Sequence, residues 1–226
     1  MDFKAGEIFA IDKPYRISSF GALAHFRYVL SRTLGYKVKI GHAGTLDPLA
    51  TGVLILCTGK ATKRIEEFQG QTKEYTATLQ LGATTASYDM EHEVNASFPT
   101  EHITRELIND TLPQFIGNIE QIPPTYSAVK VNGDRAYELR RAGEEVKLKP
   151  KHIHIDEIEV VDFDVEKMQL SLRVVCGKGT YIRALARDLG RALNSGAYLT
   201  ALRRTRVGDF TIDRCLDYEH IREWIE

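Results

Sequence analysis

The sequence predicts an α+β fold with a central, mostly antiparallel sheet flanked by helices and loops. Segments with strand periodicity and segments with helical periodicity alternate irregularly along the 226 residues. Adjacent strand segments are joined as hairpins, rather than through the regular strand-helix-strand units that build parallel sheets. The chain contains no internal repeat, so the whole length is expected to form one core.

In the first half, periodicity and turn residues define four elements. A helix is expected from Ser18 or Ser19, both good N-caps, to a stop at Gly35. The unbroken apolar run 53–57 predicts a buried strand, and 61–69 predicts a helix that ends at Gly70. Apolar and polar residues alternate strictly over 73–82, which predicts a half-buried strand.

In the second half, a helix is expected over about 104–115, and the Pro-Pro pair excludes regular structure from 121–124. The dipeptide Asn132-Gly133 predicts a tight turn, followed by one or two helical turns over 136–141. The remaining elements are a hairpin of 153–161 with 168–176, a helix over 181–193, and a single basic strand over 199–211.

Composition indicates a globular protein, with 43% apolar and 27% charged residues, and we expect a single domain over 1–226. No apolar run could span a membrane and the first residues do not resemble a signal peptide, so a cytoplasmic location is expected. The three cysteines are too widely spaced for a disulfide framework or a zinc site. His152 and His154 have no further ligands nearby, so we expect neither a metal nor a cofactor.

The net charge is −1, but the charges are segregated along the chain. Residues 171–208 hold eight Lys and Arg against one acid, and 130–151 hold seven against four, whereas 85–125 hold seven acids and one Arg. Clustered cations suit a polyanion such as RNA, whatever the total charge. Ordinary solvated helix faces would produce the same pattern, so charge alone does not choose between these interpretations.

Two glycine patterns suggest nucleotide-binding loops but fail on spacing. Gly52 and Gly59 are separated by six residues where a phosphate loop has four, and Gly177-Lys-Gly179 has Ile182 in the place of the third glycine. The chain has no Gly-x-Ser-x-Gly sequence either, which argues against a serine hydrolase.

The segment Gly-His-Ala-Gly-Thr-Leu-Asp-Pro-Leu-Ala-Thr-Gly at 41–52 is the strongest candidate site. Its three glycines permit tight turns and the close approach of a ligand. Asp47 precedes Pro48, which biases Asp47 toward an extended backbone and gives the loop a defined shape. By itself, the segment predicts either a catalytic aspartate in a shaped loop or a capping aspartate in a glycine-rich turn.

A resemblance favours the catalytic alternative. Over fourteen consecutive positions, 41–54, the segment resembles the defining motif of the TruB family of bacterial tRNA pseudouridine-55 synthases. Further similar segments are Asp12-Lys-Pro14 with Ser18-Ser19, Lys73-Glu-Tyr75, 121–130, 176–183 and 202–205. The resemblance implies a pseudouridine synthase fold and the isomerisation of uridine 55 in the T loop of tRNA, by base flipping and without a cofactor. It also implies a mobile, RNA-binding thumb over about 121–151.

The resemblance also implies a catalytic set. Asp47 is the nucleophile, attacking at C1′ or at the base or assisting elimination at the sugar. Arg183 is the countercharge of Asp47, and Tyr75 stacks on the uracil and handles the C5 proton. Each residue has a structural alternative, because Tyr75 fits a core position and Arg183 fits a charged helix surface.

Binding residues follow in the same way. His42 resembles the histidine that occupies the space vacated by the flipped base. Tyr181 packs against the flipped nucleotide, and Leu202 lines the uracil pocket. Three cations are expected to bind RNA, namely Lys130, Arg203 and Arg204. The structural alternatives are a turn histidine for His42 and a core position for Leu202.

The chain departs from the family pattern in two places. Arg16 stands where relatives carry Gly, and Thr85-Ala-Ser-Tyr-Asp89 replaces Thr-Asp-Thr-x-Asp, which leaves a supporting role for the first acid open. Many relatives continue into a PUA domain, whereas this chain ends at Glu226, so we expect a short family form or a truncated chain. We expect a monomer that recognises the T stem-loop of tRNA, with no membrane and no obligate protein partner.

Two rival functions remain. A tRNA-folding factor without chemistry would need only the basic surface, and the joint presence of Asp47, Tyr75 and Arg183 argues against it. A synthase that works with guide RNA and partner proteins is disfavoured, because the chain has no RNA-binding extension and no long basic tail.

Overall fold

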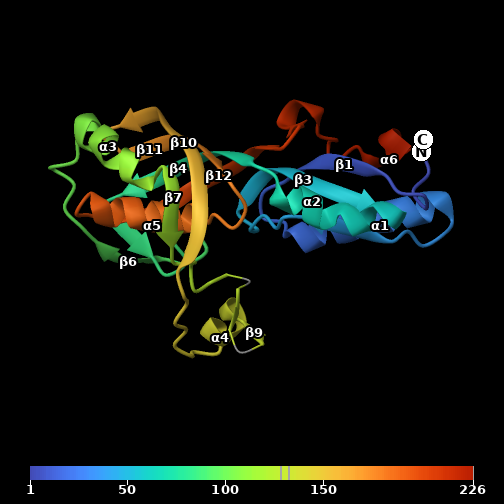
Figure 1. The fold of residues 1–226 in the computed structure, drawn as a ribbon, viewed down its shortest axis with the longest axis horizontal. Coiled ribbons are helices and arrows are strands. Elements are labelled where there is room, and N and C mark those ends of the chain that lie inside the picture. Colours follow the sequence, from blue (N-terminus) through green and yellow to red (C-terminus); the bar gives the residue numbers. More distant parts are fainter. Residues whose placement is uncertain (128, 132, 226) are drawn as a thin grey trace. The chain divides into compact units, whose positions relative to one another are not determined.

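A computed structural model describes every residue except Ala128, Asn132 and Glu226, and it does not describe the side chains of Lys130, Val131 and Arg135. The fold is α+β, as expected from the sequence (Figure 1). By internal contacts the chain divides into two compact units. Unit 1 comprises Met1–Thr76 with Leu202–Glu226, and unit 2 comprises Ala77–Ala201. Within the described residues, no helix is long and apolar enough to cross a membrane.

Unit 1 is built around strand β3 (Ala50–Thr58), in which every residue except Thr51 is buried. β3 pairs antiparallel with β1 (Ile8–Lys13) and with β2 (Ile40–Ala43), and parallel with β12 (Ala197–Val207). The sheet is therefore mixed, with one parallel pairing in a largely antiparallel arrangement. The other elements of the unit are α1 (Ser19–Leu34), a 3₁₀ helix (Gly59–Arg64), α2 (Ile65–Gly70), β13 (Phe210–Thr211), a 3₁₀ turn (Ile212–Arg214) and α6 (Ile221–Ile225).

Helix α1 has the boundaries that the sequence predicts. Ser18 caps its N-terminus, because its Oγ accepts a hydrogen bond from the Gly21 amide at 2.9 Å. Gly35, with φ of 72°, ends the helix in the left-handed conformation. Its buried stripe packs into a core cluster with β1 and β3, and the stripe consists of Ala22, Leu23, Phe26, Val29 and Leu30.

Unit 2 is a sheet with helices α3 (Arg105–Thr111) and α5 (Ile182–Ala192). Its strand order is β4 (Lys73–Leu81), β11 (Gln169–Cys176), β10 (Lys151–Asp164) and β7 (Gly117–Gln121). β10 and β11 form the predicted hairpin, and β4 has the predicted alternation of buried and less buried residues. A separate small sheet pairs β5 (Ala83–Thr85) with β6 (Val94–Ser97).

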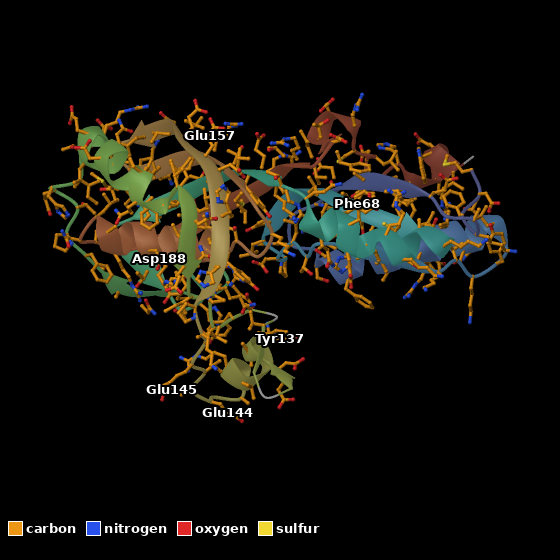
Figure 2. All side chains as sticks on the ribbon, in the orientation of Figure 1. Phe68, Tyr137, Glu144, Glu145, Glu157 and Asp188 are labelled. Atoms are coloured by element: carbon orange, nitrogen blue, oxygen red, sulfur yellow. The ribbon has the colours of Figure 1, made fainter. Side chains whose placement is uncertain are left out.

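Residues 122–150, between β7 and β10, form a segment that projects from the sheet of unit 2 (Figure 1). We call it the thumb segment. It contains the two-residue ladder of β8 (Lys130–Val131) with β9 (Asp134–Arg135), followed by α4 (Ala136–Arg141), which is the short helix that the sequence predicts. Figure 2 shows Tyr137, Glu144 and Glu145 on this segment. Asn132, half of the predicted turn dipeptide, lies outside the described residues.

Several predictions of local structure need correction. The expected single strand over 199–211 is wrong, because β12 ends at Val207, the chain turns at Gly208 (φ 54°), and β13 pairs back onto β12. The helix expected over 61–69 begins as a 3₁₀ helix and becomes α-helical only at Ile65. The helix expected over about 104–115 becomes 3₁₀ at Leu112, directly before Pro113, which has no amide hydrogen to donate. The short strands β1, β2, β5, β6 and β7 were not predicted.

Candidate active site

The loop between β2 and β3 carries Asp47, and the backbone around this residue is held on both sides. Ser19 Oγ accepts a hydrogen bond from the amide of Leu46 and donates one to the carbonyl of Leu46, each at 2.8 Å. The Arg16 amide donates to the carbonyl of Pro48 at 2.9 Å, and the Ala50 amide donates to that of Asp47 at 3.0 Å. Asp47, itself half-buried, therefore presents its carboxylate from a backbone that does not depend on a ligand for its shape.

Lys13 supplies a buried cation beneath this loop. Its side chain has no solvent exposure, and its Nζ donates to the carbonyls of Pro14 at 2.9 Å and Ile17 at 2.6 Å and lies 3.5 Å from that of Pro48. Burial lowers the pKa of Lys13 to about 8, and the negative charge of Asp47 limits the fall. Lys13 is therefore protonated at neutral pH and favours the ionised form of Asp47.

Arg204 links the start of the loop to strand β3. It is 1% exposed, and its guanidinium donates to the carbonyls of Val53 at 2.8 Å and Gly44 at 3.0 Å. β12 approaches β3 closely at Gly52, whose φ is 104° and where a Cβ would lie 2.1 Å from the carbonyl oxygen of Arg204. Arg204, which the sequence placed among RNA contacts, thus lies inside unit 1 and positions the loop. Arg203 is half-exposed and pairs with Asp12 at 2.7 Å.

His42 lies on β2, opposite Leu56 of β3. Its Nδ1 is buried and has no hydrogen-bond partner among the described residues. Burial, and secondarily the charge of Arg204, lowers the pKa of His42, so the ring is neutral at neutral pH. A neutral ring is suited to stacking on a nucleobase, because no charge has to lose its hydration.

Leu202 and Tyr75 belong to the same unit as Asp47. Leu202 of β12 pairs with Ala50 in the parallel register with β3 and is partly buried. Ala50 lies three residues after Asp47 in the chain. Tyr75 is on β4 and is 8% exposed. Unit 1 thus contains six of the predicted site residues, namely His42, Asp47, Tyr75, Leu202, Arg203 and Arg204.

In unit 2, Arg183 stands in the first turn of α5 and is 5% exposed. Its guanidinium donates to the carbonyls of Ser87 at 3.2 Å and Tyr126 at 3.0 Å, and its Nε lies 3.7 Å from Asp89 Oδ2. Ser87 Oγ in turn donates to Asp89. Tyr88, between these two residues, has a φ of 59°, which is strained for a side chain of this size.

Asp89 lies beside the predicted site residue Arg183, although no role was predicted for this acid from the sequence. The signal available was the last acid of Thr85-Ala-Ser-Tyr-Asp89, which this chain retains although the first acid of the family pattern is absent. The side chain of Asp89 is 9% exposed, and its carboxylate lies where it orients the guanidinium of Arg183.

The predicted residue Tyr181 directly precedes α5, and Gln121 fixes its backbone. The Gln121 side chain accepts from the Tyr181 amide at 2.9 Å and donates to its carbonyl at 3.2 Å. Lys130 is part of β8 in the thumb segment, but its side chain lies outside what the structure describes.

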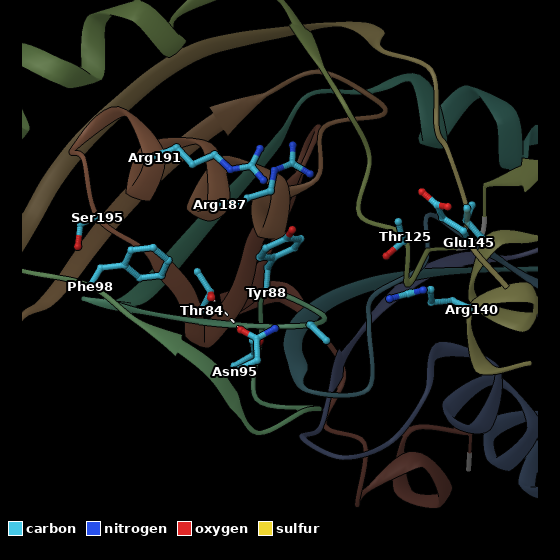
Figure 3. Close-up of a pocket in the computed structure, with 14 residues that line it drawn as sticks. Thr84, Tyr88, Asn95, Phe98, Thr125, Arg140, Glu145, Arg187, Arg191 and Ser195 are labelled. Carbon is cyan, nitrogen blue, oxygen red and sulfur yellow. Dashed lines mark hydrogen bonds between the residues drawn. The ribbon is translucent and has the colours of Figure 1, made fainter. Parts of the chain in front are cut away.

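Unit 2 also contains a pocket of about 500 Å³ with walls from α5, β5, β6 and the thumb segment (Figure 3). Aromatic and cationic side chains line it, among them Tyr88, Phe98, Arg140, Arg187 and Arg191. The guanidinium of Arg187 is bound to Asp188 at 2.8 and 3.0 Å and to the carbonyl of Ile122 at 2.8 Å, so this arginine ties α5 to the base of the thumb segment. Across the described residues, no group of three or more His, Cys, Asp or Glu is arranged to hold a metal ion.

Two family models together match residues 31–226. Residues 31–182 match the sequence model of the TruB family pseudouridylate synthase N-terminal domain, and residues 183–226 match that of the tRNA pseudouridylate synthase B C-terminal domain. The chain belongs to the TruB family.

Two of the TruB-family relatives align along nearly their whole length, and a third along 70% of its length. The chain is 62% identical over 229 residues to tRNA pseudouridine synthase B of Bacteroides thetaiotaomicron, covering 100% of this chain and 95% of the relative. The protein of the same name from Flavobacterium johnsoniae is 49% identical over 227 residues, and the alignment covers 100% of this chain and 98% of the relative. The tRNA pseudouridine synthase B of Francisella philomiragia is 42% identical over 219 residues, and the alignment covers 96% of this chain and 70% of the relative.

Solved structures confirm the pseudouridine synthase fold. A chain in the crystal structure of a Cbf5-Nop10-Gar1 complex matches with a TM-score of 0.72 at 28% identity, covering 99% of this chain and 56% of that one. A chain in the structure of an H/ACA RNP bound to a substrate RNA containing 2′-deoxyuridine matches with a TM-score of 0.68 at 25% identity, covering 98% and 54%. This TruB-family chain therefore spans just over half the length of those two chains.

Proposed function

We propose that this TruB-family chain isomerises uridine to pseudouridine at position 55 in the T loop of tRNA, with Asp47 as the catalytic nucleophile. The observation that carries the proposal is the loop of Asp47, which Ser19, Lys13 and Arg204 hold in shape and which has a cation beneath it. Relatives up to 62% identical are named tRNA pseudouridine synthase B, which supports tRNA as the substrate.

The isomerisation breaks the bond from N1 to C1′, rotates the uracil, joins C5 to C1′, and transfers a proton away from C5 while N1 gains one. Attack at C1′, attack at the base and elimination at the sugar all begin from an ionised carboxylate. The positive charge of Lys13, which interacts with Asp47, favours that form. In this proposal Tyr75 stacks on the uracil and handles the C5 proton, and Arg183, oriented by Asp89, is the countercharge of Asp47.

Base flipping explains the remaining residues of the proposed site. A uridine inside a folded loop must leave its stack before reaction, at a cost of a few kcal/mol. His42 fills the vacated space as a neutral ring, while Tyr181 and Leu202 contact the flipped nucleotide. Lys130 and Arg203 contact phosphates, and Arg204 acts by holding the loop rather than by touching RNA. We propose that the chain acts as a cytoplasmic monomer without an obligate protein partner.

The test is an assay of pseudouridine formation on unmodified tRNA and on an isolated T stem-loop, with no guide RNA. Asp47→Asn should bind tRNA within about two-fold of wild type but lose at least ~10³-fold in rate, because it removes the nucleophile. Asp110→Asn, which changes an exposed aspartate on α3, is the matched control and should retain wild-type rates. Binding of tRNA without product from the wild-type chain would instead support the folding-factor alternative.

A further inference from the structure

Positive charge is concentrated in one segment of unit 1 outside the proposed site. Residues 14–40 contain five Lys and Arg and no Asp or Glu, in a chain whose net charge is −1. Four of these cations line one shallow groove of about 990 Å³, together with Ala24, Tyr28, Ser31 and Val38; they are Arg27, Arg32, Lys37 and Lys39. We refer to this surface as the α1 groove.

Helix α1 forms one wall of the α1 groove with a stripe distinct from its core-facing stripe. Ala24, Arg27, Tyr28 and Ser31 follow the spacing i, i+3, i+4 and i+7, which places them on one side of the helix. The opposite wall is the extended segment 37–39. Ser31 Oγ joins the two walls, because it accepts a hydrogen bond from the Val38 amide at 3.3 Å. The groove is therefore a formed feature and not an accidental gap between side chains.

The charges of the α1 groove are not neutralised by neighbouring acids. In the part of the chain that the structure describes, no ion pair involves any of its four cations, whereas exposed Arg64 and Lys167 each pair with an acid at 2.8 and 2.9 Å. Tyr28 is 57% exposed, and its hydroxyl accepts from Arg32 at 2.8 Å, which orients the guanidinium beside the ring. Unpaired cations around an exposed aromatic ring match the phosphates and bases of a nucleic acid.

The α1 groove and the loop of Asp47 are joined along the chain by β2, within the same unit. Lys39 immediately precedes β2, and β2 ends at Ala43, four residues before Asp47. A strand of this length spans roughly 13 Å, which corresponds to a few nucleotides. An RNA whose target uridine lies at Asp47 would therefore carry its neighbouring phosphates along this path, whereas an acidic protein would have no reason to follow it.

We propose that the α1 groove binds the backbone of the tRNA substrate outside the flipped uridine, through Arg27, Arg32, Lys37 and Lys39, with Tyr28 as a stacking surface. The inference rests on the proposed function, since it takes the substrate to be RNA. The α1 groove would be a second RNA-anchoring surface. It belongs to unit 1, whereas the thumb segment belongs to unit 2.

The test measures tRNA binding as a function of salt for Arg27→Ala/Lys37→Ala/Lys39→Ala. Each lost phosphate contact reduces the slope of log K against log salt by about 0.7–0.9, so the triple variant should lose about 2–3 units of slope. At low salt its Kd should rise at least ~ten-fold, and the same increase should appear in KM for pseudouridine formation. Arg32 is retained, because it also orients Tyr28.

Two control variants separate the α1 groove from general charge effects. Arg27→Lys/Lys37→Arg/Lys39→Arg keeps the charges and should retain the slope. Arg64→Ala/Arg105→Ala/Lys167→Ala removes the same charge from other exposed positions and should retain the wild-type Kd. Equal losses in this control and in the groove variant would overturn the inference.

A groove variant whose Kd stays within two-fold of wild type and whose slope falls by less than about one unit would also overturn the inference and would leave an acidic protein as the alternative occupant. Product formation by the wild-type chain is measured in parallel. Its absence would defeat the proposed function, whereas the α1 groove is judged from binding alone.

Discussion

Replacing Lys13 with Met removes a charge that unit 1 holds out of contact with water. The ammonium has no solvent exposure, and its pKa falls from 10.5 to about 8 because of burial. At neutral pH the folded chain therefore holds this charge at a cost of about 3 kcal/mol relative to water. Between pH 8 and 10.5 the unfolded chain binds more protons at this position than the folded chain, so the contribution of Lys13 to stability rises with pH over that window.

We compare the change in the free energy of unfolding when the pH rises from about 7 to about 9.5. Because of this linkage, that change should be about 2 kcal/mol more positive in the wild-type chain than in Lys13→Met. Urea unfolding of both proteins at the two pH values measures the difference, and all other titrating groups cancel in it. Lys13→Arg stays charged throughout and, like Lys13→Met, should lack the rise. A difference below about 0.5 kcal/mol between wild type and Lys13→Met would refute the view that Lys13 is a buried ammonium under the catalytic loop.

Two further substitutions test how the loop is held. Gly52→Ala would place a Cβ 2.1 Å from the carbonyl oxygen of Arg204 at a φ of 104°, and it should lower the free energy of unfolding by at least ~3 kcal/mol. Gly35→Ala, with φ of 72° and open space around it, should cost only about 1 kcal/mol, and equal losses in urea unfolding would contradict the close-approach argument. Ser19→Ala removes both hydrogen bonds to Leu46 and should cost about 1–3 kcal/mol and lower kcat more than tRNA affinity. An unchanged kcat would show that the loop does not need this hydroxyl.

The elements that the sequence predicted correctly are those whose signals are local. The limits of α1 follow from an N-cap serine and a glycine that takes up a left-handed conformation. The faces of β4 follow from strict alternation, and β3 follows from an unbroken apolar run. The family, and with it the candidate role of Asp47, followed from fourteen consecutive residues of motif rather than from any physical property of one aspartate. Short strands such as β2 and β7 carry too few residues for periodicity to identify them.

The environment of each charged residue was decided by the tertiary structure alone. Arg203 and Arg204 are adjacent in one basic stretch, yet one is half-exposed beside Asp12 and the other is buried against Gly44 and Val53. Successive residues of a strand face opposite sides of the sheet. Which side of β12 is covered depends on its pairing with β3, and the two strands are separated by some 150 positions in the chain. The same holds for Lys13 under its loop and for Asp89 beside Arg183, since their burial and their partners come from long-range contacts that a local pattern does not encode.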